Sequence, residues 1–304
     1  MTTAPSGEQF EIVFGEQRAT IVEVGGGVRE YSVGGVPVLE PYRVQDICDG
    51  AHGAPLIPWP NRLADGRYRF DGIDYEVALS EPAKHNAIHG FLRWRSWRAL
   101  EREPSRVVLG TPLRPQPGYP FALDVSVAYE LSEEGLTVRT TAVNVGEHAC
   151  PYGAGQHPYL SPGEGPIDDC SLELPARTRL LTDEQRQLPT GREPVDGGEF
   201  DFRVARRLGE IRIDSAFTDL VRDERARAVA RLFRPTGERV ELWVDEHHAF
   251  LEVYTGDTLA PSRRRGGLAV EPMTCAPNAF QSGDGLVRLD PEQALSTRWG
   301  VRLV

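Results

Sequence analysis

One imidazole in the sequence occupies a narrow and stiff point of the chain. His157 lies between small residues and Pro158 in the stretch CPYGAGQHPYL. The residue before a proline favours an extended backbone, and a proline inside a sheet is confined to strand ends and edges. We therefore expect His157 at the end of a strand. Because imidazole titrates near neutral pH, this position suits a general acid or base; the alternative is a histidine that only satisfies a buried carbonyl.

A carboxylate has a similar setting near the end of the chain. In the stretch GGLAVEPMTCAPNAF, the apolar residues 268–270 predict a buried strand, which Glu271 ends and Pro272 follows. A carboxylate beside a buried strand is costly unless it is paired or has a function. Glu271 is thus a second candidate for proton transfer, and a structural, hydrogen-bonded glutamate is the alternative.

Two further stretches concentrate polar and aromatic side chains. Asn61 and Arg62 follow Trp59 in PWPNRLADG, and His89 precedes Trp94 in HNAIHGFLRWRSW. Aromatic faces beside hydrogen-bonding groups suit a sugar, which has apolar C–H faces and a polar rim. The alternative is that the tryptophans belong to the core, and for Trp97, three residues after Trp94, the core is the expectation.

The elements that must position these residues are predicted to be short strands. Apolar residues alternate on both sides of Asp71-Gly72 over residues 68–79, and Asp-Gly between two such runs indicates a hairpin. Residues 125–131 and 136–142 alternate around a second turn, at 133–135. With 31 glycines, 24 prolines and no sustained helical periodicity, the chain is predicted to be all-β, a sandwich or barrel, and one domain over residues 1–304.

Composition excludes several partners. The formal net charge of −11 opposes binding to nucleic acid, and no apolar run reaches the ~18 residues that a membrane span requires. The N-terminus lacks the pattern of a signal peptide. Four cysteines without a CxxC pair predict neither a zinc site nor disulfides, so we expect a cytoplasmic protein with free thiols. The basic run RRR at residues 263–265 is expected to be a solvated loop.

Taken together, the motifs resemble a known family. The segments NRLADGRYRFDG, AIHGF, GQHPYL, IDSAFTDL, VYTGD and AVEPMTCAPNAF occur in the order seen in aldose 1-epimerases, the galactose mutarotase family. The resemblance runs from about residue 10 to the end of the chain. The variants EPMTCAPNAF and FTDL are similar to a bacterial branch of uncharacterised sugar epimerases. This resemblance implies a large antiparallel β-sandwich with an open sugar-binding cleft.

The resemblance also implies roles for individual residues. Arg62 and His89, with Asn61 beside them, would bind sugar hydroxyls, His157 would be the general acid and Glu271 the general base. Asp214 would anchor a further hydroxyl. The family usually has Asp-His where this chain has Asp214-Ser215, so Asp219 in FTDL is a possible substitute for Asp214. No metal or cofactor is implied, and the expected partner is a small-molecule sugar bound by a monomer or homodimer.

The implied reaction interconverts the α and β anomers of an aldohexose, with the acid and the base expected on opposite sides of the sugar. Three other functions remain open. A glycoside hydrolase would use two carboxylates, such as Glu271 with Asp214 or Asp219. A sugar-binding protein without catalysis could share the fold. A hexose 6-phosphate epimerase would need a cationic pocket, which residues 263–265 could supply. The sequence does not identify the aldose.

Overall fold

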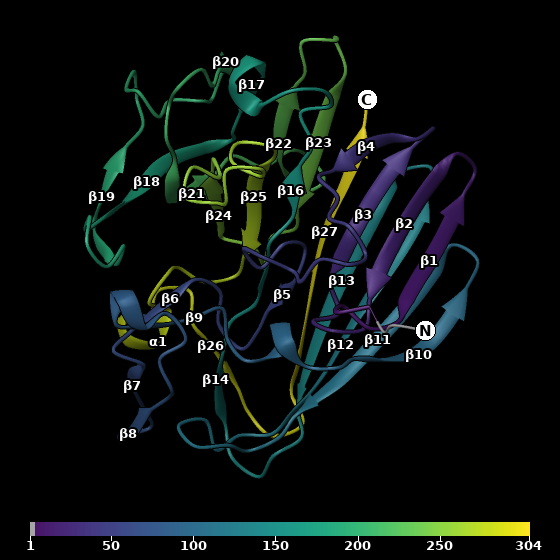
Figure 1. The fold of residues 1–304 in the computed structure, drawn as a ribbon. Coiled ribbons are helices and arrows are strands. Elements are labelled where there is room, and N and C mark those ends of the chain that lie inside the picture. The colour runs from purple at the N-terminus through teal and green to yellow at the C-terminus, as the bar shows by residue number, and fades with distance from the viewer. Residues whose placement is uncertain (1–3) are drawn as a thin grey trace.

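The computed structural model describes residues 4–304 and consists almost entirely of antiparallel strands, as predicted (Figure 1). One large sheet contains, in spatial order, β1 (Gln9–Phe14), β2 (Gln17–Val22), β3 (Val28–Val33), β4 (Val36–Leu39), β16 (Tyr159–Leu160), β25 (Leu268–Met273), β24 (Phe250–Tyr254), β21 (Asp214–Leu220), β18 (Ala176–Thr182) and β19 (Pro189–Pro194). Two short strands, β15 (Gly155–Gln156) and β5 (Pro55–Leu56), attach to this sheet beside β25.

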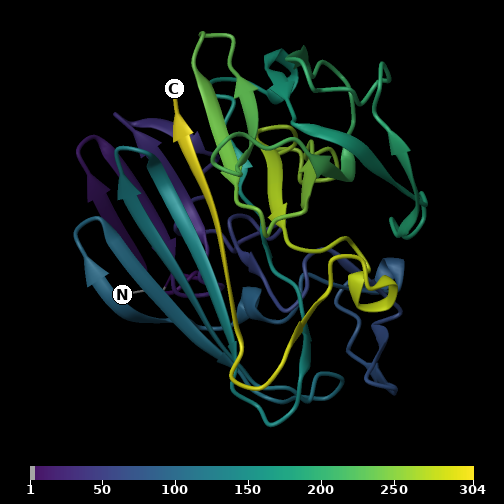
Figure 2. The same cartoon turned by 180° about the vertical axis from the view of Figure 1, so that it is seen from behind.

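The second large sheet lies across the first. It contains β10 (Arg98–Glu103), β11 (Arg106–Leu113), β12 (Leu123–Ser132), β13 (Gly135–Asn144), β27 (Ala294–Leu303), β23 (Arg239–Val244), β22 (Ala228–Phe233), β17 (Ser171–Glu173) and β20 (Arg206–Arg207). Strands β1 and β2 contact β12 from the opposite layer. Figure 2 shows β27 running the length of this sheet from behind.

Smaller elements gather at one end of the two sheets (Figure 1). They are the strand pairs β6 (Arg62–Ala64) with β9 (Asn86–Ile88), β7 (Arg67–Phe70) with β8 (Ile73–Glu76), and β14 (Cys150–Tyr152) with β26 (Val287–Leu289), the short helix α1 (Ala279–Ser282), and 3₁₀ turns at Pro82–Lys84 and Leu92–Trp94. A further 3₁₀ turn, Ile167–Asp169, lies beside β17 at the opposite end (Figure 1). Among residues 4–304, no helix is long and apolar enough to cross a membrane.

The two predicted hairpins are confirmed. Asp71 and Gly72 join β7 to β8 with φ angles of 49° and 80°, the left-handed values that a two-residue hairpin turn of this kind requires. Strands β12 and β13 pair from Leu123 to Asn144 around the second turn. There Gly135 has φ 94°, and a Cβ at this position would lie 2.4 Å from a backbone oxygen of β27.

A buried amide ties the two sheets together directly beneath His157. Gln156 donates from Nε2 to the carbonyl of Gly53 and to the hydroxyl of Tyr129, at 3.1 Å each, and its Oε1 accepts from Nε1 of Trp299 at 3.1 Å. Tyr129 and Trp299 belong to β12 and β27 of the second sheet. Because unpaired buried polar groups are costly, these bonds fix the backbone position of the residue that precedes His157.

The basic run at residues 263–265 is not simply a solvated loop. Arg264 is exposed, but the guanidinium of Arg265 is largely buried and binds Asp168, Asp257 and the carbonyls of residues 209 and 211. Arg263 contacts Nδ1 of His52. The expectation of a solvated side chain is wrong for Arg265, because two carboxylates from separate segments bind the N–H groups of its planar guanidinium.

Candidate active site

Three neighbouring strands bring carboxylates to one face of the first sheet. Glu252 of β24 lies directly opposite Glu271 of β25, and Asp214 of β21 lies opposite Tyr254 of β24. Side chains of directly opposed residues, and of every second residue along a strand, share one face. Residues that are far apart in the sequence therefore meet here because of the strand register.

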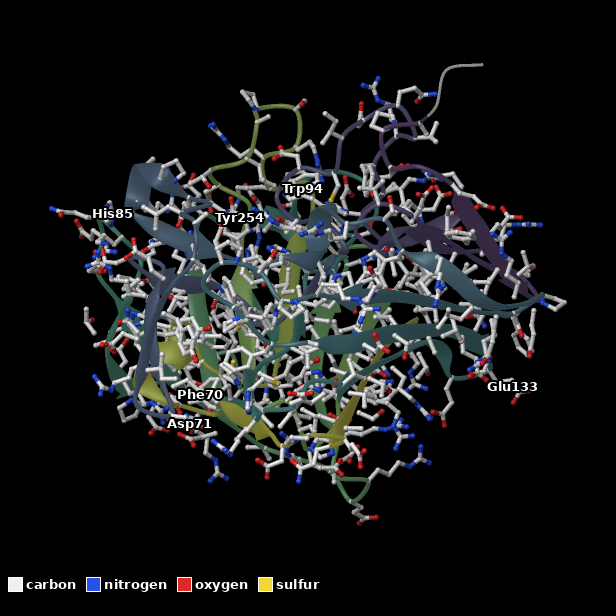
Figure 3. All side chains as sticks on the ribbon, turned by 90° about the horizontal axis from the view of Figure 1, so that it is seen from below. Phe70, Asp71, His85, Trp94, Glu133 and Tyr254 are labelled. Carbon is white, nitrogen blue, oxygen red and sulfur yellow. The ribbon has the colours of Figure 1, made fainter. Side chains whose placement is uncertain are left out.

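A hollow of about 380 Å³ opens over this face, within the size range of small-molecule sites. It is lined by six of the seven residues predicted for catalysis or sugar binding, namely Asn61, Arg62, His89, His157, Asp214 and Glu271, and by further polar residues that include Glu81, Lys84, Arg93, Tyr159, Gln187 and Tyr254. Figure 3 labels Tyr254 on the same side of the molecule as Trp94 and His85, away from the Asp71 hairpin.

His157 and Glu271 contact each other at the floor of the hollow. Nε2 of His157 lies 3.1 Å from Oε1 of Glu271, and the two side chains are 6% and 3% exposed. The imidazole stacks on the ring of Tyr159, with centroids 4.9 Å apart. Its backbone N–H donates to the carbonyl of Ala54, and its own carbonyl accepts from the N–H of Gly53. His157 thus sits at a strand end with a fixed backbone, as its sequence setting predicts.

Burial shifts the proton affinities of this pair in opposite directions. Burial, with smaller effects from His52 and Arg93, lowers the pKa of His157 to about 3. Burial also raises the pKa of Glu271 well above the usual carboxyl value; Asp214 adds to the rise and Arg62 opposes it. The resting pair therefore holds one transferable proton, which a single step across the 3.1 Å contact can move between the carboxyl and the imidazole.

His89 presents a fixed hydrogen-bond donor to the hollow. Its Nδ1 accepts from the backbone N–H of Asn61 at 3.1 Å, and burial, together with the charge of His157, lowers the pKa of His89 well below its ordinary value. The neutral ring must then carry its hydrogen on Nε2. The turn depends on Gly90, with φ 63°, since a Cβ there would lie 2.0 Å from the carbonyl oxygen of Ile57.

Arg62 is held by a carboxylate before any ligand arrives. Its Nε and Nη2 donate to the two oxygens of Glu81 at 2.9 and 3.1 Å. The segment is anchored further because the N–H of Asn278, which precedes α1, donates to the carbonyl of Arg62. The remaining guanidinium donors stay available for ligand hydroxyls, while Glu81 offsets most of the charge.

Strand register separates the two candidate aspartates. Asp214 begins β21, lines the hollow and accepts a hydrogen bond from Nε2 of Gln187. Asp219 lies five positions later on the same strand, is exposed and accepts from the hydroxyl of Thr178 at 2.5 Å. The structure therefore places Asp214, and not Asp219, in the hollow. Ser215 alternates to the other face of β21, so its departure from the family pattern does not alter the hollow.

The tryptophans do not form the sugar-facing wall that the sequence suggested. Trp59 is buried against Phe280, Trp97 is buried as expected, and Trp94 is exposed outside the hollow. The aromatic rings of the hollow are those of Tyr159 and Tyr254, because they lie on the strands of its floor, whereas the tryptophans lie in or beyond the turns that enclose it.

Several residues of the hollow were not singled out from sequence. Lys84, Arg93 and Gln187 come from turns and loops, and nothing in their local sequence indicates where they meet. Glu252 had a detectable signal, since it interrupts the apolar run in AFLEVYTG. The guanidinium of Arg93 lacks a hydrogen-bond or ion-pair partner among residues 4–304. In the same range, no cluster of three or more His, Cys, Asp or Glu side chains is arranged to hold a metal ion.

Comparisons of this sequence with known proteins agree on one family. The family model for aldose 1-epimerase matches residues 8–301. The chain is 35% identical to the uncharacterised protein YihR of Escherichia coli over 294 residues, covering 94% of this chain and 90% of that protein. It is 25% identical to the aldose 1-epimerase of E. coli, covering 72% and 69%. It is 33% identical to human galactose mutarotase over 171 residues, covering 52% and 47%.

Solved structures share the fold. A putative aldose 1-epimerase from E. coli superposes with a TM-score of 0.84 at 20% identity, covering 98% of this chain and 99% of that one. A GalM/aldose epimerase homologue from Caenorhabditis elegans gives a TM-score of 0.85 at 18% identity, covering 98% of both chains. At these identities the likeness concerns the galactose mutarotase-like sandwich itself.

Proposed function

Because the chain belongs to the aldose 1-epimerase family, we propose that it interconverts the α and β anomers of a free aldohexose by acid–base ring opening. The observation that carries this proposal is the buried contact between His157 and Glu271 at the floor of the hollow, at 3.1 Å. Hydrogen-bonding groups of His89, Arg62 and Asp214 surround it.

The reaction needs one base and one acid near a single carbon atom. Glu271 takes the proton from the anomeric hydroxyl O1 while His157 protonates the ring oxygen O5, and the C1–O5 bond breaks. The free aldehyde turns about C1–C2, and the ring closes on the other face. O1 and O5 are bonded to the same carbon, so adjacent groups can serve both oxygens, and the expected placement on opposite sides of the sugar is not required. Each group contributes roughly 10²–10⁴-fold.

The protons that the reaction uses come from His157 and Glu271 and return to them. Transfer from Glu271 to His157 produces the carboxylate and imidazolium that ring opening uses. After opening, Glu271 holds the proton from O1 and His157 is neutral. In ring closure the hydroxyl on C5 returns a proton to His157, and Glu271 gives its proton to the carbonyl oxygen. Transfer of this proton from His157 back to Glu271 restores the resting pair, and no oxidant, reductant or further proton donor is consumed.

The surrounding groups have separate tasks in this proposal. The Nε2–H of His89 and the free donors of Arg62 bind sugar hydroxyl oxygens, and the Asp214 carboxylate accepts from a sugar hydroxyl. Asn61 acts mainly through its neighbours. Its N–H fixes the tautomer of His89, and its Oδ1 accepts the N–H of Arg62 at 2.8 Å. Asn61 is thus a positioning residue at the edge of the hollow.

Polarimetry tests the proposal directly. Freshly dissolved α-glucose and α-galactose are followed with and without purified protein, and spontaneous mutarotation is subtracted. We expect acceleration with at least one free aldose. The absence of acceleration with free and 6-phosphorylated aldohexoses alike would favour a sugar-binding protein without catalysis. Release of reducing sugar from oligosaccharides would instead indicate a glycoside hydrolase, which leaves His157 unexplained.

One observation favours a second candidate, an epimerase of 6-phosphorylated aldohexoses. Arg93 lines the hollow together with Lys84. Its guanidinium lies 5.4 Å from the centroid of the Trp94 ring but has no hydrogen-bond or ion-pair partner among the described residues, and a phosphate would provide one. The basic run at residues 263–265 is less suited, because Arg265 is already bound to Asp168 and Asp257. If the second candidate holds, Arg93→Gln lowers kcat/KM for a 6-phosphate at least tenfold and leaves kcat/KM for the free sugar within about twofold.

A further inference from the structure

A third carboxyl group lies behind the catalytic pair. Glu252 occupies the middle of β24, is 3% exposed, and does not line the hollow. It is directly opposite Glu271 on one side and Ala216 on the other. Opposed side chains in an antiparallel pair share a face, and the small side chain of Ala216 leaves room beside the Glu252 carboxyl. Glu252, Glu271 and Asp214 therefore share one side of the sheet.

The hydrogen bonds of Glu252 make sense only with a proton on it. No N–H or hydroxyl donor among residues 4–304 reaches its buried Oε2, whereas Asp214, its diagonal neighbour on the same face of β21 and β24, places a second carboxyl within reach of a shared hydrogen bond. A hydrogen bond between two carboxyl groups must contain one proton. Asp214 is partly exposed to the hollow and already accepts from Gln187, so the negative charge belongs on Asp214 and the proton on Glu252.

The charges around Glu252 lead to the same assignment. The groups that face it are Asp214 from β21, Glu271 from β25 and Arg62 from β6. Arg62 already binds Glu81 through two hydrogen bonds, so three adjacent ionised carboxylates would lack sufficient compensation. Burial raises the pKa of Glu252 well above the usual carboxyl value; Asp214 and Glu271 add to the rise, and Arg62 opposes it.

We propose that Glu252 is a positioning residue that remains protonated and donates its O–H to Asp214, which fixes the Asp214 carboxylate toward the bound sugar. The same proton keeps a further negative charge away from Glu271. This role rests on the proposed function, because the sugar that Asp214 orients is the substrate of that reaction. Glu252 touches neither the sugar nor the reacting atoms and acts only through its two neighbours.

A pH-dependent affinity follows from this arrangement. As pH rises through the raised pKa of Glu252, its O–H is lost and the new carboxylate repels Asp214, so KM increases. Glu252→Gln replaces the neutral acid by an amide that donates at every pH, so its KM stays level where that of the parent rises. Glu252→Ala removes the donor, so its KM is about tenfold above the neutral-pH value of the parent and does not change as Glu252 titrates in the parent. The turnover number kcat of Glu252→Gln stays within about threefold of the parent at neutral pH.

The experiment measures kcat and KM for mutarotation from about pH 6 to pH 10 in the parent, Glu252→Gln, Glu252→Ala and a control, Glu193→Gln. The control changes a partly exposed carboxylate of the same sheet that pairs with Arg179 outside the hollow. Thermal unfolding checks that each variant is folded. An increase of KM with pH in Glu252→Gln equal to that of the parent would overturn the proposal. So would a loss of neutral-pH activity in Glu252→Gln as large as in Glu252→Ala.

Infrared spectroscopy supplies a readout that does not depend on activity. The parent contains a protonated carboxyl absorption at neutral pH that disappears in Glu252→Gln and persists in Glu193→Gln. If no such absorption is lost, Glu252 is ionised and the proposal is wrong. If the parent has no mutarotase activity, the proposed function fails, while the infrared difference still decides whether Glu252 holds a proton.

Discussion

At the scale of single residues, the chemistry depends on burial more than on residue type. A solvent-exposed imidazole and carboxylate 3.1 Å apart would form an ion pair at neutral pH. In this hollow, burial lowers the pKa of His157 and raises that of Glu271. In this balance of charges the single proton rests on Glu271 and the imidazole is neutral, and ring opening begins when that proton moves to His157.

This balance predicts a broad pH profile. The pair titrates as a unit. It gains a second proton only when pH falls toward the lowered pKa of His157, about 3, and it loses its one proton when pH rises through the raised pKa of Glu271. We therefore expect kcat to show no inflection near pH 6.5, the ordinary histidine value, and to decline on the alkaline side. Circular dichroism at each pH separates unfolding from titration. A halving of kcat near pH 6.5 in folded protein would contradict this balance.

The two aspartates of β21 provide a matched pair of variants. Asp214→Asn removes the charged acceptor from the hollow, so KM for the sugar should rise roughly 10-fold or more, as for the loss of a charged hydrogen bond. Asp219→Asn changes an exposed residue bonded to Thr178, and KM should stay within about twofold. Steady-state mutarotation kinetics measure both. Equal effects of the two changes would mean that Asp214 does not bind the sugar.

At the scale of elements, the register of three strands assembles the site. Asp214, Glu252 and Glu271 come from β21, β24 and β25, and their pairing alone puts them on one face. The small strand β6 then adds Arg62, held by Glu81, and the turn after β9 adds His89, held by Asn61. Each of these two residues is oriented by a hydrogen bond to a neighbour, so the site is largely formed before the sugar arrives.

The hydrogen bonds by which Gln156 joins the two sheets beneath His157 give a prediction at the scale of elements. Gln156→Leu leaves the buried Nε1–H of Trp299 without its acceptor and the hydroxyl of Tyr129 without one donor. Each unpaired buried group costs about 1–3 kcal/mol, so the free energy of unfolding should fall and kcat should fall with it as His157 loses its fixed position. Urea unfolding and mutarotation kinetics measure the two losses. Unchanged stability would show that the two sheets do not depend on this amide.

At the scale of the whole molecule, the sequence predicted the strands better than the walls of the site. The alternation around Asp71-Gly72 and the position of His157 at a strand end follow from local chemistry, which the sequence contains. The expectation that Glu271 ends its strand is wrong, because β25 continues through Pro272 to Met273 and pairs with β24 from Ala269 to Met273. The choice between Asp214 and Asp219 requires knowing which face of β21 the hollow occupies. Arg93 and Gln187 enter the site through folded loops, and the partners of Arg265 come from two distant segments, so local patterns could not reveal them.

The hollow draws its lining from much of the chain, from Asp49 to Glu271. The family model likewise matches nearly the full length, residues 8–301. The net charge of −11 belongs mainly to the outer surface, where many carboxylates pair with arginines. Within the hollow, the cations of Arg62, Lys84 and Arg93 offset the acidic floor, which suits a polar ligand with hydroxyl groups.

The most direct test of the central claim is the rate of mutarotation by Glu271→Gln, corrected for the spontaneous reaction, beside that of His157→Asn. Glu271→Gln keeps the shape of the side chain but cannot accept the proton from O1. We expect kcat to fall roughly 10²–10⁴-fold in each variant and sugar binding to persist. The loss of kcat in the double variant should be smaller than the product of the two single losses, since both residues serve one event. An unchanged kcat in folded Glu271→Gln would contradict the account and remove Glu271 from the mechanism.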